Sequence, residues 1–466
     1  MPRNEQQEPT ATPPPTNSHL DGDHLELTEP YDTGGAAPSV ARWNLSVLTL
    51  DVVFFSLSVA FFDPSTVLPQ LLERLGATGL MIGLFSSFRS LAFNLPQIFV
   101  AYATMNREKQ KPFLGKINAV CRLPLLVLPF IIARSEMSEA NRHIALAATI
   151  GLLFFWSLGD GLGYVPWMEI VARSFSNRTR GRFFATTQSL SGTISIGIAA
   201  LGVAPILYSK TLGYPANYAL LVLLYALLMQ VSLAGVLLIK EPPVPDSFHE
   251  RAKEPHPSLK EYLQQLPTLF RTNIVFRKLC TVALLVNFGL ASQPFYVLYA
   301  KRYFHLGDEW GGKFQVYLAL GAVTLLPLWA FISERKGAHN SIRFAAFGCL
   351  LTPIVALTIG RVSPWLYGLV FLLMGGTLGW GFWIVLNHYL LLHIDEKQRQ
   401  VFLALINLVL APSSFYSALG GFFIHNGEFA SIQGFPVLFL LTALVVGAGV
   451  YQTRYLPNPS QNETST

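Results

Sequence analysis

Charged side chains are scarce in this chain of 466 residues: Asp, Glu, Lys and Arg together make up 13% of it. Average soluble domains carry about 25% charged residues. Hydrophobic residues here reach 52%, and the mean hydropathy is +0.42. A soluble protein of this length could not bury so much apolar surface in one core, so the composition excludes an ordinary soluble fold. The lipid bilayer is the solvent that suits it.

Cysteine is also scarce, and the chemistry-bearing motifs of enzymes are missing. The three cysteines, Cys121, Cys280 and Cys349, each lie in an apolar run, and no CxxC pair occurs. We therefore expect no disulfide, metal site or cofactor, and interpret the cysteines as packing residues. No HExxH, GxSxG or GxxxxGK[ST] motif is present, which argues against an enzyme and against ATP-driven transport. Basic residues do not alternate with aromatic ones in a stripe, so we expect no nucleic-acid partner.

Long apolar runs dominate what is there. A helix that crosses a bilayer needs about 20 mostly apolar residues, and twelve runs of that kind can be placed. They cover roughly 43–62, 80–102, 113–132, 144–171, 184–208, 218–239, 279–299, 315–332, 344–360, 364–393, 402–425 and 435–451. The fold class predicted from this pattern is an all-α integral membrane protein with twelve transmembrane helices.

The placement of basic residues predicts the orientation. If the amino terminus is cytoplasmic, the cytoplasmic loops and tails carry 23 of the 33 Lys and Arg residues, and the opposite loops carry 8. Cytoplasmic loops are enriched in Lys and Arg, so we expect both termini to be cytoplasmic and the protein to lie in the cell membrane as a monomer.

A polar segment divides the helices six and six. The predicted organisation is a disordered cytoplasmic tail (1–40), an N-terminal six-helix bundle (41–239), a cytoplasmic linker (240–278), a C-terminal six-helix bundle (279–455) and a C-terminal tail (456–466). The amino-terminal tail is rich in Pro, Thr and acids, and we expect a disordered segment here and not a signal peptide. Within the linker, apolar residues recur at helical spacing from Leu259 to Phe270, which predicts an amphipathic helix on the cytoplasmic face; a plain linker is the alternative.

The two halves share short patterns at equivalent positions. Leu-Gly-Asp-Gly at 158–161 corresponds to Leu-Gly-Trp-Gly at 378–381, and the basic loop at 177–184 corresponds to 396–403. Such duplication places a binding site between the halves near the middle of the bilayer.

With its twelve helices and long central loop, the chain resembles the major facilitator superfamily of secondary transporters. Arg180-Gly181-Arg182 and Glu334-Arg335-Lys336-Gly337 resemble that family's cytoplasmic loops, the second with Glu for Asp. The resemblance implies two six-helix bundles that alternate access to a central site. It also implies that Arg107, Arg180, Glu334 and Arg335 belong to gating loops, with Arg107 and Arg335 latching the bundles in an outward-open state. Orientation by positive charge alone is the alternative.

The sequence departs from the family at three points. Asn106-Arg107-Glu108-Lys109, in the first-half copy of the family's Asp-Arg-x-Gly loop, lacks both the acid and the glycine. The fifth predicted span, 184–208, lacks a Gly-Pro pair. In the fourth, 144–171, Asp160 stands where the family has an arginine. Drug–proton exchange is therefore not implied.

Four ionisable residues fall inside the helices of the first half: Asp51, Arg89, Arg122 and Asp160. A charge in the bilayer needs a partner or a cavity. We expect Asp160 to pair with Arg89 and Asp51 with Arg122, although the opposite pairing is also open. The four would carry protons or bind a charged solute group; a static salt bridge is the structural alternative.

The second half offers amides and aromatics instead. The candidates for a solute pocket are Asn287, Gln293, Tyr296, Trp380 and Asn387. Together these features predict a secondary active transporter of a small organic solute, with proton coupling as an option. The alternatives are a transporter-like sensor or scaffold and, less favoured, a membrane enzyme.

Overall fold

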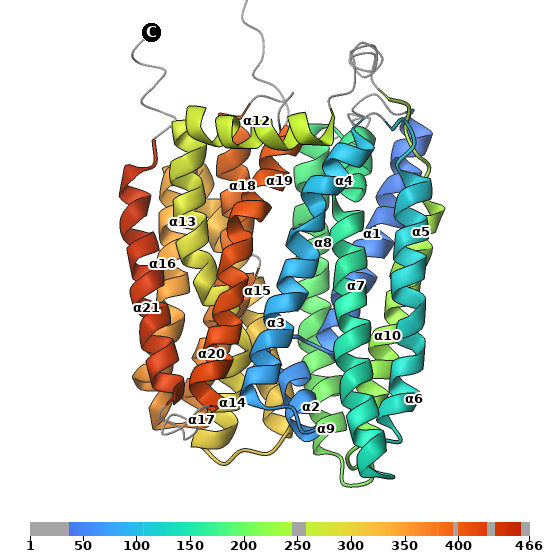
Figure 1. The fold of residues 1–466 in the computed structure, drawn as a ribbon, viewed down its shortest axis with the longest axis vertical. Coiled ribbons are helices and arrows are strands. Elements are labelled where there is room, and N and C mark those ends of the chain that lie inside the picture. The colour runs from blue at the N-terminus through green and yellow to red at the C-terminus, as the bar shows by residue number, and fades with distance from the viewer. Residues whose placement is uncertain are drawn as a thin grey trace, which may run out of the picture.

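The computed structural model describes residues 37–105, 107–244, 258–379, 381–394, 399–425 and 434–457. Over these ranges all regular elements are helices. In Figure 1 most helices run side by side along the longest axis, and α12 (Leu259–Thr272) lies across one end. We call this end the α12 face. The opposite end, with α2 (Val67–Arg74) and α14 (Gln293–Tyr303), is the α2 face.

Eleven helical segments of the described residues are long and apolar enough to cross a membrane. The twelfth predicted span is present as two helices, α3 (Gly79–Asn94) and α4 (Pro96–Thr104), which follow one another directly and are each too short to be counted. The predicted all-helical membrane fold is confirmed.

The other spans are α1 (Pro38–Phe61); α5 (Lys111–Arg122) with η1 (Leu123–Val127) and α6 (Leu128–Ile132); α7 (Glu139–Ser174); α8 (Asn177–Gly197) with η2 (Ile198–Val203) and α9 (Ala204–Tyr208); α10 (Ala216–Leu238); α13 (Ile274–Ala291) with α14; α15 (Glu309–Lys336); α16 (Ala338–Leu357); α17 (Pro364–Leu373) with η4 (Met374–Gly379) and α18 (Gly381–His393); α19 (Arg399–Leu410) with η6 (Ala411–Ser414) and α20 (Phe415–His425); and α21 (Gly434–Gln452).

Large apolar side chains cover the outside of the helices. Leu201 is 83% exposed and Phe130 is 62% exposed, and many other Leu, Phe and Val residues of the spans are open as well. Such an outer surface would be costly in water and is favourable against lipid. The spans therefore present large apolar side chains outward as well as burying others inside the bundle.

The spans associate in two groups that follow the chain. In the first half α1 packs on α10 and α5 on α7, and in the second half α21 packs on α13 and α16 while α15 packs on α17. The halves meet mainly where α3 packs on α20 and α8 on α15; Figure 1 shows α3 and α20 side by side. The charged residues discussed below lie within the first group and at its border with the second.

A helix, α12, occupies the part of the linker where the spacing predicts an amphipathic one, and its place on the cytoplasmic face stays a prediction. Ser258 caps its amino terminus: the Ser258 hydroxyl accepts a hydrogen bond from the Glu261 amide, and the Glu261 carboxylate accepts one from the Ser258 amide. Tyr262 and Leu266 are buried beneath the helix. The Tyr262 ring lies 5.4 Å from that of Tyr102, so α12 is fastened to the first half near α4. The predicted tails lie outside the described residues, apart from 37–40, which open α1, and 456–457.

Candidate functional site

A buried arginine lies between two aspartates inside the first group of helices. Arg122 of α5 approaches Asp160 of α7 at 3.2 Å (Nη2 to Oδ1) and Asp51 of α1 at 3.8 Å (Nη1 to Oδ1). Ser232 of α10 joins them, because its hydroxyl accepts from Arg122 Nη1 at 2.8 Å and donates to Asp51 Oδ1 at 2.6 Å. Trp167 Nε1 donates to Asp51 Oδ2 at 2.8 Å. We call Asp51, Arg122, Asp160 and Ser232 the charge cluster.

The structure corrects one of the two pairings expected from the sequence. Asp51 lies beside Arg122 as predicted, but the pairing of Asp160 with Arg89 is wrong, since Asp160 also pairs with Arg122. In the described part of the chain no carboxylate lies within ion-pair distance of Arg89. Depth along a helix could not decide this, because it leaves open which helix faces which.

The two aspartates are bound differently. Both oxygens of Asp51 accept hydrogen bonds, from Ser232 and from Trp167. Asp160 is held through Oδ1 by Arg122, and its Oδ2 has no hydrogen bond to the described residues. Asp160 therefore keeps one oxygen free for a proton or a ligand.

Glycines bring the helices close enough for these contacts. A Cβ atom on Gly159 would overlap the Cys121 side chain, next to the two residues of the Arg122–Asp160 pair. A Cβ atom on Gly235 would lie 2.8 Å from the Val47 carbonyl oxygen and 2.9 Å from the Asp51 nitrogen. The helix contacts α5–α7 and α1–α10 thus require a residue without a side chain at both places.

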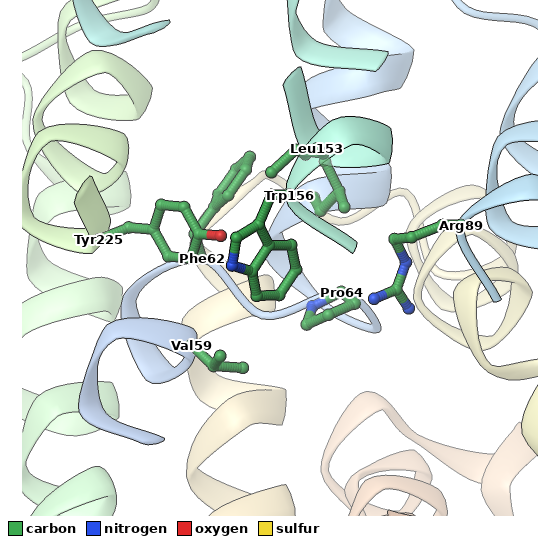
Figure 2. A pocket seen from close by; sticks show the side chains of 8 residues that line it. Val59, Phe62, Pro64, Arg89, Leu153, Trp156 and Tyr225 are labelled. Atoms are coloured by element: carbon green, nitrogen blue, oxygen red, sulfur yellow. The ribbon is translucent and has the colours of Figure 1, made fainter. Parts of the chain in front are cut away.

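Arg89 of α3 lines a cavity of its own. The cavity is also lined by Trp156 of α7, Tyr225 of α10 and apolar side chains of α1, α2 and the loop between them. In Figure 2, Arg89 and Tyr225 lie on opposite sides of Trp156. The space that the cavity encloses is about 10 Å³, roughly the room of one water molecule, and far below the roughly 300–1,000 Å³ of typical small-molecule sites. Phe55 separates it from the charge cluster: its ring stacks on Trp156 at 6.2 Å and lies 5.5 Å below the Arg122 guanidinium.

The second-half candidates that the structure describes have separate packing and hydrogen-bond partners. Asn287 donates to Ser413 Oγ at 2.6 Å, and Asn387 donates to the Trp383 carbonyl of its own helix at 2.9 Å. Tyr296 is fully buried with its ring stacked on Phe439. Gln293 is half-buried at the start of α14, and Trp380 lies outside the described residues. Their role in solute binding stays a prediction.

The two arginines expected to latch the bundles, Arg107 and Arg335, each lie over an aromatic ring of their own half. Arg107 lies over the Phe113 ring, and Arg335 over the Phe331 ring. Arg180 lies in the first turn of α8, and the Glu334 side chain lies outside the described residues.

The bundles are instead joined by ion pairs at the α2 face, which the sequence reasoning missed. Arg74 Nε lies 2.7 Å from Asp308 Oδ2, Lys301 Nζ lies 2.8 Å from Asp308 Oδ1 and 3.1 Å from Glu73 Oε2, and Arg302 Nη2 lies 3.1 Å from Glu73 Oε1. Burial acts to raise the pKa of the Asp308 carboxyl, but Lys301 and Arg74 outweigh it and hold that pKa below its ordinary value. The sequence gives little indication of this network, because its members lie in the short segments between predicted spans, where charged residues are ordinary.

A family model describes most of the chain. The model of the Major Facilitator Superfamily matches residues 50–418. No curated protein matches the sequence as a relative.

Solved structures with the same fold are transporters. A point mutant of the nucleoside transporter NupG has a TM-score of 0.61 at 11% identity and covers 89% of this chain and 99% of its own. A POT family transporter in complex with 5-aminolevulinic acid has a TM-score of 0.63 at 12% identity, covering 89% and 96%. A bacterial homologue of the iron transporter ferroportin in an outward-facing state has a TM-score of 0.58 at 14% identity, covering 89% and 99%.

The TM-scores show that these structures share the fold of this chain, and the family model shows the family to which the chain belongs. The apolar spans agree with the family match and with the similar structures. Together these findings indicate a multi-pass membrane transporter without enzymatic chemistry. This chain belongs to the Major Facilitator Superfamily.

Proposed function

We propose that the protein is a proton-coupled secondary transporter that moves a small organic solute by alternating access. The observation that carries the proposal is the single arginine shared by two carboxylates: Arg122 contacts both Asp51 and Asp160. With all three groups ionised, the cluster holds one negative charge more than positive. An uncompensated charge at this depth is costly, and uptake of one proton removes it.

Asp160 is the proton-binding residue of this proposal. Asp51 is stabilised as a carboxylate by donors on both oxygens, whereas Asp160 has only Arg122. A proton on Asp160 would weaken its hold on Arg122 and leave Arg122 to Asp51. Because the three residues come from α1, α5 and α7, this shift changes how those helices hold together, and a bistable bundle can convert such a change into motion.

The α2-face ion pairs support alternating access. They link the two halves at one end, so the conformation described is closed there. The Lys and Arg count predicts that the α12 face is cytoplasmic, and the closed end would then be the outer one. Opening the transporter outward requires these ion pairs to break.

The test is uptake into proteoliposomes that contain a pH-sensitive dye. The solutes would be nucleosides, short peptides, amino acids and small carboxylates, each with and without an inwardly directed proton gradient. We expect at least one class to enter faster with the gradient and to carry protons with it. Asp160→Asn should abolish the gradient dependence, since the amide cannot exchange a proton.

Ser46→Ala is a matched control, because Ser46 is exposed on α1 and its hydroxyl bonds only to its own helix. An uptake rate of the native protein that is the same with and without the proton gradient would refute proton coupling but not transport. Lack of uptake of every class would count against transport and favour the sensor alternative.

A further inference from the structure

The side chains around the Arg89 cavity offer more hydrogen-bond donors than acceptors. The polar side chains that line it are Arg89, Trp156 and Tyr225. Trp156 is 8% exposed and Tyr225 is 2% exposed, and neither Trp156 Nε1 nor Tyr225 Oη has a hydrogen-bond partner among the described residues. A guanidinium and an indole N–H can only donate, and a phenol readily does so.

Unpaired polar atoms at such burial are uncommon in native proteins and call for an explanation. The remaining lining residues supply none, since Val59, Phe62, Pro64, Leu68 and Leu153 are apolar. Whatever satisfies the donors must come from outside the described protein.

Arg89 adds a positive charge that the described residues do not pair. The aspartates of the charge cluster form no ion pair with Arg89, because both are engaged with Arg122 behind the Phe55 ring. The acid of the neighbouring loop, Asp63, is occupied otherwise: its Oδ1 accepts hydrogen bonds from the amides and hydroxyls of Ser65 and Thr66. An arginine at membrane depth without an acid is best satisfied by an anionic ligand.

We propose that Arg89, Trp156 and Tyr225 form a subsite for a carboxylate group of the transported solute. One cation with neutral donors matches one negative charge, which favours a carboxylate over a phosphate dianion. The aromatic and aliphatic walls suit an apolar body attached to that group. The cavity is small in the conformation described and is lined by first-half residues alone, so binding a solute requires the helices of that half to move apart around it. This inference rests on the transport function proposed above and adds the class of solute.

Binding to the purified full-length protein tests the subsite without any gradient. The probes are benzoate, its neutral isostere benzamide, chloride and inorganic phosphate, each followed by the shift in melting temperature up to ~10 mM. We expect benzoate to raise the melting temperature and benzamide not to. A response to chloride and phosphate equal to that of benzoate would show an inorganic anion site and overturn the proposal, as would no response to benzoate.

Variants locate the response. Arg89→Gln should weaken benzoate binding roughly 10–100-fold, the range for losing a charged hydrogen bond, and Arg89→Lys should retain part of it. Should Arg89→Gln fail to fold, Trp156→Phe and Tyr225→Phe each remove one donor that has no partner in the described protein and keep an aromatic ring. Both should fold and bind benzoate several-fold more weakly.

Tyr262→Phe is the matched control. Tyr262 of α12 is 4% exposed, and its hydroxyl is also without a hydrogen-bond partner among the described residues, but it does not line the cavity. Its variant should bind benzoate like the native protein; equal losses in all three aromatic variants would overturn the proposal. Gradient-driven uptake that survives without benzoate binding would refute only the subsite, whereas benzoate binding without uptake of any solute would refute only the transport proposal.

Discussion

At the scale of single residues, Ser232 decides how the charge cluster is held. Its hydroxyl donates to Asp51 and accepts from Arg122, so it bridges two opposite charges that are themselves 3.8 Å apart. Ser232→Ala would leave each charge one hydrogen bond short in a buried site, at a cost of about 1–3 kcal/mol. We expect a lower midpoint in thermal unfolding and a changed pH dependence of uptake.

Ser46→Ala gives the reference, because that exposed serine on α1 should change stability by about 0.5 kcal/mol or less. Similar losses for the two variants would mean that the Ser232 bridge contributes nothing particular.

The three charged residues of this cluster could be found from the sequence, together with the pairing of Asp51 with Arg122, but the partner of Asp160 could not. Asp51, Arg122 and Asp160 stand out because ionisable groups in apolar runs are rare. Ser232 and Trp167 do not stand out, since Ser and Trp are ordinary in membrane helices. Which aspartate Arg122 would bind depended on helix rotation, and hydropathy carries little information on rotation when apolar residues surround each helix.

At the scale of the helices, Gly235 sets the distance between α1 and α10. A Cβ atom there would lie within 3 Å of backbone atoms of Val47 and Asp51, and backbone cannot step aside as a side chain can. Gly235→Ala should therefore push the helices apart and cost about 1–3 kcal/mol. The Ser232–Asp51 bond would lengthen with it, because Ser232 lies less than one turn away on the same helix.

Gly151→Ala is the control for this change. Nothing lies within 4 Å of the Cβ position of Gly151 in α7, so that variant gains helix propensity without a clash. The comparison is the melting temperature of the two variants. A stable Gly235→Ala protein with an unchanged pH dependence would show that the α1–α10 contact is not as tight as described.

Helix positions were predictable because hydropathy reports them, whereas helix interruptions were only partly so. Among the prolines inside the predicted spans, Pro96, Pro294 and Pro412 lie at or beside a break in the helices. Pro166, Pro327 and Pro353 lie inside continuous helices. The π-helical segments η2 and η4 had no sequence signal beyond glycine content. In η4 the Gly376 carbonyl accepts a hydrogen bond from Trp329 Nε1, a tertiary contact that local sequence cannot specify.

At the scale of the whole molecule, the number of spans and the division into two halves followed from hydropathy and basic loops. The contacts between the halves did not, because the residues on either side are far apart in the chain. Glu73 and Arg74 meet Lys301, Arg302 and Asp308 across more than 200 positions. Their charges looked like ordinary loop residues until the fold placed them together.

Neutralising the α2-face ion pairs should open that face. Arg74 is 48% exposed, so each pair contributes only about 0.2–1 kcal/mol. Glu73→Gln with Arg74→Gln would then remove about 1–2 kcal/mol, which changes a ratio of conformations about 5–30-fold. Spin labels at Lys210→Cys and Val362→Cys, two exposed positions in different halves, would report a longer distance. The native cysteines are buried and should not be labelled.

The pair Glu139 and Arg142 provides the control and pH provides a second test. These residues form a 3.0 Å ion pair within α7 that does not link the two halves, so Glu139→Gln with Arg142→Gln should leave the label distance unchanged.

Because the pKa of Asp308 is lowered, its carboxylate and the stabilisation it gives persist below the ordinary carboxyl range of about 4 and are lost only at stronger acid. Acidification from about pH 7.5 to about pH 5.5 therefore leaves the ion pairs of Asp308 intact. If that acidification still lengthens the label distance, the proton acts elsewhere, and the lengthening should vanish in Asp160→Asn. Lengthening that persists in Asp160→Asn would contradict the assignment of the proton to the charge cluster.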